Sequence, residues 1–76
     1  MKLKNVGSNQ TEVQRGEITV FYSYSTPVAV FIPGRGALVT SQHYSRTTSK
    51  HITQCVARWG ATRTEVTQAE IDALAA

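Results

Sequence analysis

The sequence predicts one small α+β domain, in which an antiparallel meander of three to four strands is packed by one amphipathic helix and followed by a short C-terminal helix. Two observations predict this class. Apolar residues alternate with a period of two up to about residue 43, and then recur with the period of a helix. The chain has 76 residues, which is enough for a single domain over 1–76 and too few for two.

The predicted sheet consists of four extended segments, at 11–14, 17–24, 28–32 and 37–43. The second is the clearest strand, because aromatic and β-branched residues alternate along it. One face of it carries Ile18, Val20, Tyr22 and Tyr24, and the other carries Thr19, Phe21 and Ser23. The third segment is almost continuously apolar, which predicts a strand that is covered on both faces or covered by a partner. Between the last two, Pro-Gly-Arg-Gly at 33–36 predicts a type II turn.

The main helix is predicted by an apolar stripe that consists of Ile52, Cys55, Val56 and Trp59. Ser45, Thr47 and Thr48 are its candidate N-caps, and Gly60 is the expected stop. The face of this helix that we expect to be exposed to solvent consists of Ser49, Lys50, Thr53, Gln54 and Arg58. We expect Trp59 to lie in the core with Phe21, Val30 and Ile52, and an interface with a partner is its alternative location.

Residues 62–66 are expected to form a short extended connector to the last helix. Thr67 and Glu70 have the spacing of a capping box, in which a hydroxyl and a carboxylate satisfy the first amides of a helix. Ile71 and Leu74 then give that short terminal helix one side to bury.

The charge is unevenly distributed along the chain. The formal net charge is +3, yet residues 1–63 hold all eight basic and only two acidic residues, net +6, and residues 64–76 hold three acidic residues, net −3. A basic body favours anionic partners such as nucleic acid or acidic protein surfaces. No run approaches 18 apolar residues and no apolar run follows the basic start, so we expect neither a membrane partner nor a secretory signal. The single Cys55 excludes an internal disulfide and indicates a cytoplasmic setting.

The richest segment for chemistry lies at the expected start of the main helix. The first amides of a helix lack internal partners and attract anions, and cations or hydroxyls beside them complete a phosphate site. In the alternative interpretation the hydroxyls only cap the helix amides and the surface is covered by water. The sequence leaves the phosphate site and the capping interpretation open. The candidate phosphate, nucleic-acid or partner-binding residues are Arg35, Tyr44, Ser45, Arg46, Thr47, Thr48, Ser49, Lys50 and His51. Arg35 enters this set from the turn at 33–36, where it could also be a merely exposed arginine.

Metal, cofactor and catalytic roles are not expected. His43, His51 and Cys55 do not complete a four-ligand zinc site, and no cofactor motif is present. Cys55 lies on the apolar stripe, where a thiol is a small core residue rather than a nucleophile. The aromatic residues could form a stacking surface for bases or one packed face of the sheet; they are Phe21, Tyr22, Tyr24, Phe31 and Tyr44.

Three segments occur in an order that resembles a family of small proteins encoded by bacterial and archaeal viruses. They are Ser-Tyr-Ser-Thr-Pro-Val-Ala at 23–29, the turn at 33–36, and Tyr-Ser-Arg-Thr-Thr-Ser-Lys-His-Ile at 44–52. The resemblance implies a phage accessory protein that acts in the host cytoplasm. It implies no established activity, and Cys55 lies outside the matching motif.

The leading hypothesis is a non-catalytic phage protein that binds a host macromolecule, such as a protein or ribonucleoprotein complex of defence or nucleic-acid processing, and inhibits it. The alternatives are direct, weakly specific nucleic-acid binding, an oligomeric sponge for a phosphate-containing nucleotide, and a structural part of the virion. A chain this small buries little surface when it folds alone, so a homodimer is an alternative to a monomer.

Overall fold

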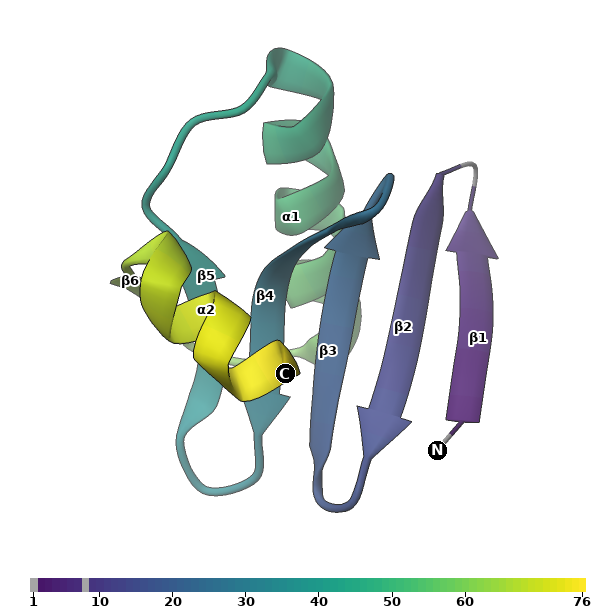
Figure 1. The fold of residues 1–76 in the computed structure, drawn as a ribbon, viewed down its shortest axis with the longest axis vertical. Helices are drawn as coiled ribbons and strands as arrows, with labels where there is room; N and C mark the ends of the chain where they lie inside the picture. Colours follow the sequence, from purple (N-terminus) through teal and green to yellow (C-terminus); the bar gives the residue numbers. More distant parts are fainter. Residues whose placement is uncertain (1, 8) are drawn as a thin grey trace.

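A mixed six-stranded sheet with one helix on each face forms the fold (Figure 1). The computed structural model describes the chain except Met1 and Ser8 and the side chain of Lys2. The elements are β1 (Lys2–Gly7), β2 (Gln10–Arg15), β3 (Ile18–Ser23), β4 (Thr26–Ile32), β5 (Gly36–Thr40), α1 (Arg46–Trp59), β6 (Arg63–Val66) and α2 (Gln68–Ala75).

The strands follow one another across the sheet in chain order, from β1 to β6. The first five pair antiparallel, and β6 pairs parallel to β5 after α1 has crossed over the sheet. The predicted α+β class is therefore confirmed, whereas the predicted three to four strands are too few. The sheet gains one strand at each edge.

Both added strands are held by pairing with a neighbouring strand, β1 with β2 in one hairpin and β6 with β5 across the length of α1. In β1, Leu3 lies opposite Val13 of β2. In β6, Arg63 lies beside Ala37 of β5, so the expected connector at 62–66 is largely a strand. β5 ends at Thr40, earlier than the predicted 37–43, because the chain then turns away toward α1.

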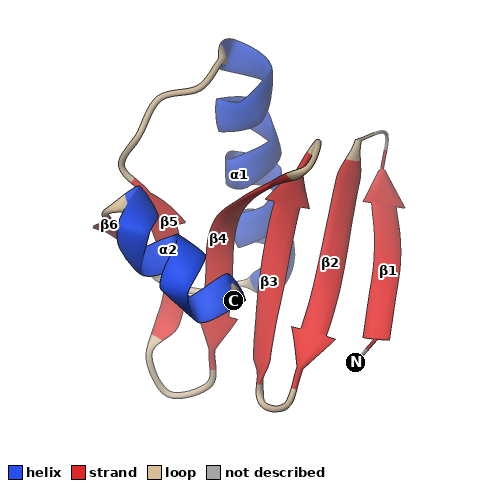
Figure 2. Ribbon diagram, in the orientation of Figure 1, coloured by secondary structure: helices blue, strands red, loops and turns tan. Residues whose placement is uncertain are grey.

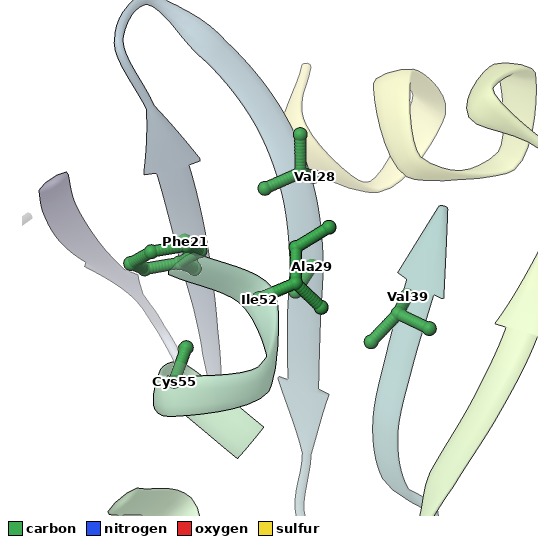
Figure 3. Close-up of a cluster of buried hydrophobic side chains, with 6 residues drawn as sticks. All are labelled: Phe21, Val28, Ala29, Val39, Ile52 and Cys55. Atoms are coloured by element: carbon green, nitrogen blue, oxygen red, sulfur yellow. The ribbon is translucent and has the colours of Figure 1, made fainter. Parts of the chain in front are cut away.

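One hydrophobic cluster lies between α1 and the sheet (Figure 3). Its buried members are Phe21, Val28, Ala29, Val39, Ile52 and Cys55. Trp59 packs against this cluster and is half-buried, with its ring edge-on to Phe21 at 6.4 Å between centroids. The predicted grouping of Trp59 with Phe21 and Ile52 is confirmed.

A second cluster lies under α2 on the other face and consists of Val20, Val30, Leu38 and Ile71. Val30 therefore packs away from Trp59, and its expected place beside that ring is wrong. The apolar run at 28–32 does sit between two helices, as its composition predicts. α2 is also held by polar contacts, since Gln68 Nε2 donates to the Pro27 carbonyl at 2.8 Å and the Arg15 guanidinium donates to the Ala75 carbonyl.

Local signals set the helix ends and the β4–β5 turn. Ser45 is the N-cap of α1, and its Oγ accepts from the Thr48 amide at 3.1 Å. Gly60 closes α1 with a φ of 65°. Thr67 caps α2 by accepting from the Glu70 amide at 3.2 Å. In the turn, the Arg35 amide donates to the Ile32 carbonyl at 2.9 Å while Gly34 has a φ of 87°, which fits the predicted type II geometry.

Candidate functional site

The first turns of α1 divide the sequence-predicted binding segment into an inner and an outer side. Thr48 and His51 point inward and are buried, at 6% and 8% exposure, and the N-cap Ser45 is half-buried. Five residues of the segment are exposed on the outer side: Tyr44, Arg46, Thr47, Ser49 and Lys50. This division follows the helical period, because residues three and four apart share a face.

The inner side is a polar cluster that fastens α1 to β3. Ser23 Oγ lies 2.9 Å from His51 Nδ1 and donates to Thr48 Oγ1 at 3.4 Å. Ser45 Oγ also donates to Thr48 Oγ1, at 3.2 Å. Each buried hydroxyl or imidazole therefore has a partner, as burial of polar groups requires. Three residues of the candidate set, Ser45, Thr48 and His51, thus act in capping and anchoring.

Ser23 is the member of this cluster that sequence analysis did not single out. It lies 28 residues before His51, so no local spacing connects the two. The only available signal was its place on the same strand face as Phe21, which the structure confirms. A serine beside a histidine also resembles a nucleophile and its base, but Ser23 is only 2% exposed. A substrate does not reach a hydroxyl sealed in this way, so the pair works as an anchor.

The outer side is cationic and open. No acidic residue lies in the first turn of α1. Within the described part of the chain the ion pair is Arg58–Glu12, which leaves Arg46 and Lys50 without a carboxylate partner there. The Ser45 cap occupies the Thr48 amide, whereas the amides of Arg46 and Thr47 donate to no acceptor among the described residues. Capping therefore accounts for part of the helix start, and it leaves two amides without a described acceptor beside two exposed cations.

Two exposed tyrosines flank this start. Tyr44 is 39% exposed and Tyr24 is 54% exposed. Tyr24 was expected on a strand face with Tyr22, but it lies in the β3–β4 turn with a φ of 59°. Its amide donates to the Asn9 carbonyl at 2.7 Å, and its ring centroid lies 6.1 Å from that of His51. A bulky residue with positive φ is strained, and the surrounding contacts hold it in place.

Arg35 is not brought to this surface. It lies in the β4–β5 turn, and Figure 2 places that turn at the opposite end of the sheet from the start of α1. The expected cooperation of Arg35 with Arg46 and Lys50 therefore has no support in the fold.

The residues weighed for zinc or nucleophilic chemistry are kept apart or sealed. His51 faces Ser23, while His43 Nδ1 lies 3.5 Å from Ser49 Oγ at the surface. Among the described residues, no group of three His, Cys, Asp or Glu side chains is placed to hold a metal ion. Burial raises the pKa of the Cys55 thiol from 9.0 to about 12, so the thiolate required of a nucleophile is strongly disfavoured.

The region of β1 and β2 carries two shallow cavities, one on each face of the sheet. On the side of α1, Lys4, Glu12, Gln14 and Thr19 line a polar cavity of about 250 Å³. On the side of α2, an apolar cavity of about 280 Å³ is lined by Leu3, Thr11, Val13, Tyr22, Tyr24 and Ser25. Neither cavity is built on the start of α1.

Comparison with known proteins connects this architecture to one family. The family whose model matches residues 1–73 is described as a family of unknown function, DUF8033. The chain belongs to this family. The DUF8033 match spans all six strands, α1 and most of α2. No curated protein and no solved structure matches the chain. Neither helix in the described part of this DUF8033 member is long and apolar enough to cross a membrane.

Proposed function

We propose that this protein is a non-catalytic binding module that holds an anionic surface of a macromolecule through the outer side of the α1 start. We call this the α1-start surface and define it by Tyr24, Tyr44, Arg46, Thr47, Ser49 and Lys50. One observation carries the proposal: Arg46 and Lys50 are exposed in the first two turns of α1 and have no carboxylate partner among the described residues, and the amides of Arg46 and Thr47 have no described acceptor. Cations at the positive end of a helix are unfavourable by themselves, and a bound anion removes that cost.

The anchoring of α1 supports binding rather than a mobile loop. Ser23, Thr48 and His51 hold the inner side of the helix start against β3. The outer residues are thereby presented on a rigid element, so little conformational entropy is lost when a partner binds. The buried Cys55 thiol and the sealed Ser23 hydroxyl offer no accessible nucleophile, which favours a binding role over an enzymatic one.

The partner that we propose is a host protein or ribonucleoprotein complex of defence or nucleic-acid processing, in the cytoplasm of a cell infected by a phage. The resemblance of segments 23–29 and 44–52 to small viral proteins motivates this class of partner. The protein would inhibit such a complex by covering an acidic or phosphate-bearing surface that the complex needs for its own substrate.

The test is a quantitative purification of the tagged protein from host cells, with charge-reversed variants. Arg46→Glu with Lys50→Glu reverses two charges on the α1-start surface. Arg35→Glu with Arg63→Glu makes the same change in net charge away from it, because both residues lie toward the β4–β5 turn. We expect a macromolecule retained by the wild type and by the control pair to be lost with the first pair. Equal retention by both double variants would refute the proposal.

Direct nucleic-acid binding is a second candidate, which the exposed rings of Tyr24 and Tyr44 favour. Bases stack on aromatic side chains while nearby cations contact the phosphates. With Arg46 and Lys50 as the two phosphate contacts, the logarithm of the affinity for a single strand should fall with the logarithm of salt with a slope of roughly −1.4. A fluorescently labelled oligonucleotide titrated at several salt concentrations measures this slope. No binding at low salt would eliminate this candidate, and nuclease treatment of the purified complex separates it from protein binding.

A further inference from the structure

We propose that the free edge of β1 is a docking site for an extended segment of a partner polypeptide whose side chains alternate between acidic and apolar. The segment would add a strand to the sheet beyond β1. The proposal does not depend on the function proposed for the α1-start surface, although Tyr24 of that surface also lines the apolar cavity beside β1.

β1 is the outermost strand of the sheet at its N-terminal side (Figure 1). It pairs with β2 on one side, and no described strand pairs with its other side. An edge strand offers a row of backbone N–H and C=O groups to an incoming strand. The backbone of β1 therefore supplies the sequence-independent part of the interaction.

On the side of α2, β1 presents the uncovered apolar side chain of Leu3, with the polar Asn5 next to it on the same face. Leu3 is 72% exposed, although it lies directly opposite Val13. α2 packs against β4 and β5, so it leaves this end of the sheet open. Leu3 and Val13 line the apolar cavity of about 280 Å³ together with Tyr22. Apolar side chains of an added strand would cover Leu3 and continue this surface.

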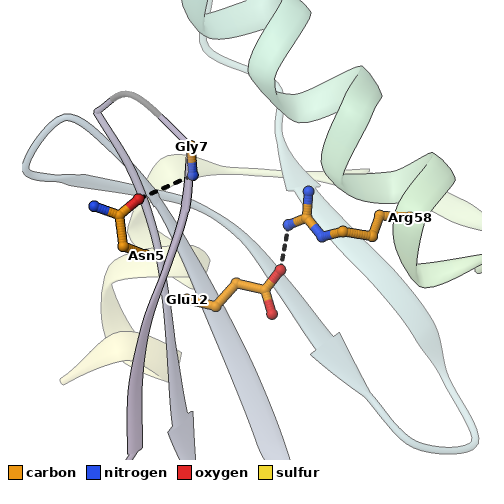
Figure 4. Close-up of polar contacts among 4 residues, drawn as sticks. All are labelled: Asn5, Gly7, Glu12 and Arg58. Carbon is orange, nitrogen blue, oxygen red and sulfur yellow. Dashed lines mark hydrogen bonds and ion pairs between the residues drawn. The ribbon is translucent and has the colours of Figure 1, made fainter.

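On the other face, β1 presents the cationic Lys4, with Val6 packed against the α1 cluster. Lys4 lies opposite Glu12, but the Glu12 carboxylate is paired with Arg58 of α1 (Figure 4). Lys4 therefore makes no ion pair among the described residues. Leu3 and Lys4 are consecutive and point to opposite faces, so an added strand needs an apolar residue on one face and an acidic residue on the next. The adjacent pair Leu3 and Lys4 thus specifies an adjacent apolar and acidic pair in the partner, whereas Asn5 and Val6 leave the flanking partner residues unspecified.

Charge also argues against the other occupants of this edge. In the self-pairing register centred on Lys4, the ammonium of Lys4 opposes that of a second copy, and like charges directly opposite one another destabilise a sheet. The second edge of the sheet, β6, carries Arg63 and Glu65 on one face and has no exposed large apolar residue. An acidic and apolar segment is therefore attracted to β1 rather than to β6.

The experiment is a titration of the full-length protein with two capped seven-residue peptides, one alternating glutamate and valine and the other alternating lysine and valine. Backbone amide shifts in the NMR spectrum locate the peptide. We expect the glutamate peptide to shift the amides of Leu3, Lys4 and Val6, and to bind more tightly than the lysine peptide. Lys4→Glu should weaken the glutamate peptide roughly fivefold and strengthen the lysine peptide.

Two matched variants complete the design. Arg63→Glu changes the same charge on the β6 edge, and Arg46→Glu with Lys50→Glu disables the α1-start surface; both should leave the binding of the glutamate peptide unchanged. Unchanged urea unfolding of Lys4→Glu shows that β1 remains in place. The proposal is overturned if the two peptides bind wild type equally or not at all. Amide shifts that map to β6 or to the α1 start overturn it as well, as does a stable dimer of the free protein that buries β1.

Discussion

Replacement of Ser23 by alanine should destabilise the protein because the cluster beneath the α1 start depends on its hydroxyl. Ser23 Oγ is the described partner of His51 Nδ1, at 2.9 Å. Thr48 loses less in this variant, since its contact with Ser23 is long at 3.4 Å and Ser45 still reaches it at 3.2 Å. The main consequence of Ser23→Ala is therefore a buried imidazole nitrogen without a hydrogen-bond partner.

The size of the effect follows from that orphaned group. A buried polar atom without a partner costs about 1–3 kcal/mol. We expect Ser23→Ala to lower the free energy of unfolding by about 2 kcal/mol, and the melting temperature by roughly 10 °C for a domain of this size. His51→Leu in the same background removes the unpaired nitrogen. The double variant should therefore be more stable than the sum of the two single losses predicts, by about 1 kcal/mol.

Urea unfolding monitored by circular dichroism measures these free energies. Ser25→Ala is the matched control, because Ser25 lies in the adjacent turn and is exposed, and its effect should stay within about 0.5 kcal/mol. If Ser23→Ala is as mild as Ser25→Ala, or if the Ser23 and His51 losses are simply additive, the argument that this cluster anchors α1 fails.

Three further predictions concern the sheet and its two cores. A Cβ on Gly36 would lie 2.8 Å from the Thr62 carbonyl oxygen, whereas a Cβ on Gly34, which has a similar positive φ, would meet no atom within 4 Å. Gly36→Ala should therefore lower the free energy of unfolding by at least about 1 kcal/mol more than Gly34→Ala does in thermal unfolding. Equal losses would contradict the close approach of β5 to the residue before β6. Burial raises the pKa of the Cys55 thiol from 9.0 to about 12, so as the pH rises the unfolded state loses this proton first and the free energy of unfolding should fall between these pH values. In urea unfolding, Cys55→Ala should lose less stability at alkaline pH than the wild type does. Parallel losses in the two proteins would refute the burial of this thiol. Ile71 is fully buried and anchors α2 on its cluster with Val20 and Val30. Ile71→Ala should therefore lower the free energy of unfolding in urea by about 2–5 kcal/mol, and Leu74→Ala, at a half-buried position, should lower it by less. The reverse order would contradict the docking of α2.

The helices were predictable because their signals are local. The stripe of Ile52, Cys55, Val56 and Trp59, the cap at Ser45 and the stop at Gly60 all act within a few residues of one another. The same holds for the α2 cap at Thr67. The stripe, the stop at Gly60 and the α2 cap appear at the predicted residues, and the α1 cap is Ser45, one of the three predicted candidates.

The edge strands were not predictable because pairing, rather than residue preference, makes them extended. β6 is exposed over Arg63, Thr64 and Glu65, so it has no buried face that a pattern could reveal. β1 mixes lysines with Leu3, which is itself exposed. Val30 was assigned to the wrong face because a continuously apolar strand has no alternation that distinguishes its two sides.

The sequence predicted where the candidate site lies along the chain, but not what its buried residues contact. The cluster of hydroxyls and cations at 44–51 marked the start of α1, and the period of the helix separates its buried residues from its exposed ones. The partner of the buried side was not evident, because Ser23 and His51 meet only when β3 and α1 pack together. The separation of Arg35 from Arg46 likewise depends on the direction in which α1 crosses the sheet.

The most direct test of the α1-start surface is photocrosslinking in host cells from single positions on the folded protein. A photoreactive amino acid at Thr47 places the reactive group between the Arg46 and Lys50 positions, and one at Thr64 places it on the exposed face of β6. The account predicts a discrete adduct from position 47 that disappears when Arg46→Glu and Lys50→Glu are added, and no such adduct from position 64. Adducts from position 64 alone, or an adduct from position 47 that survives both charge reversals, would contradict it.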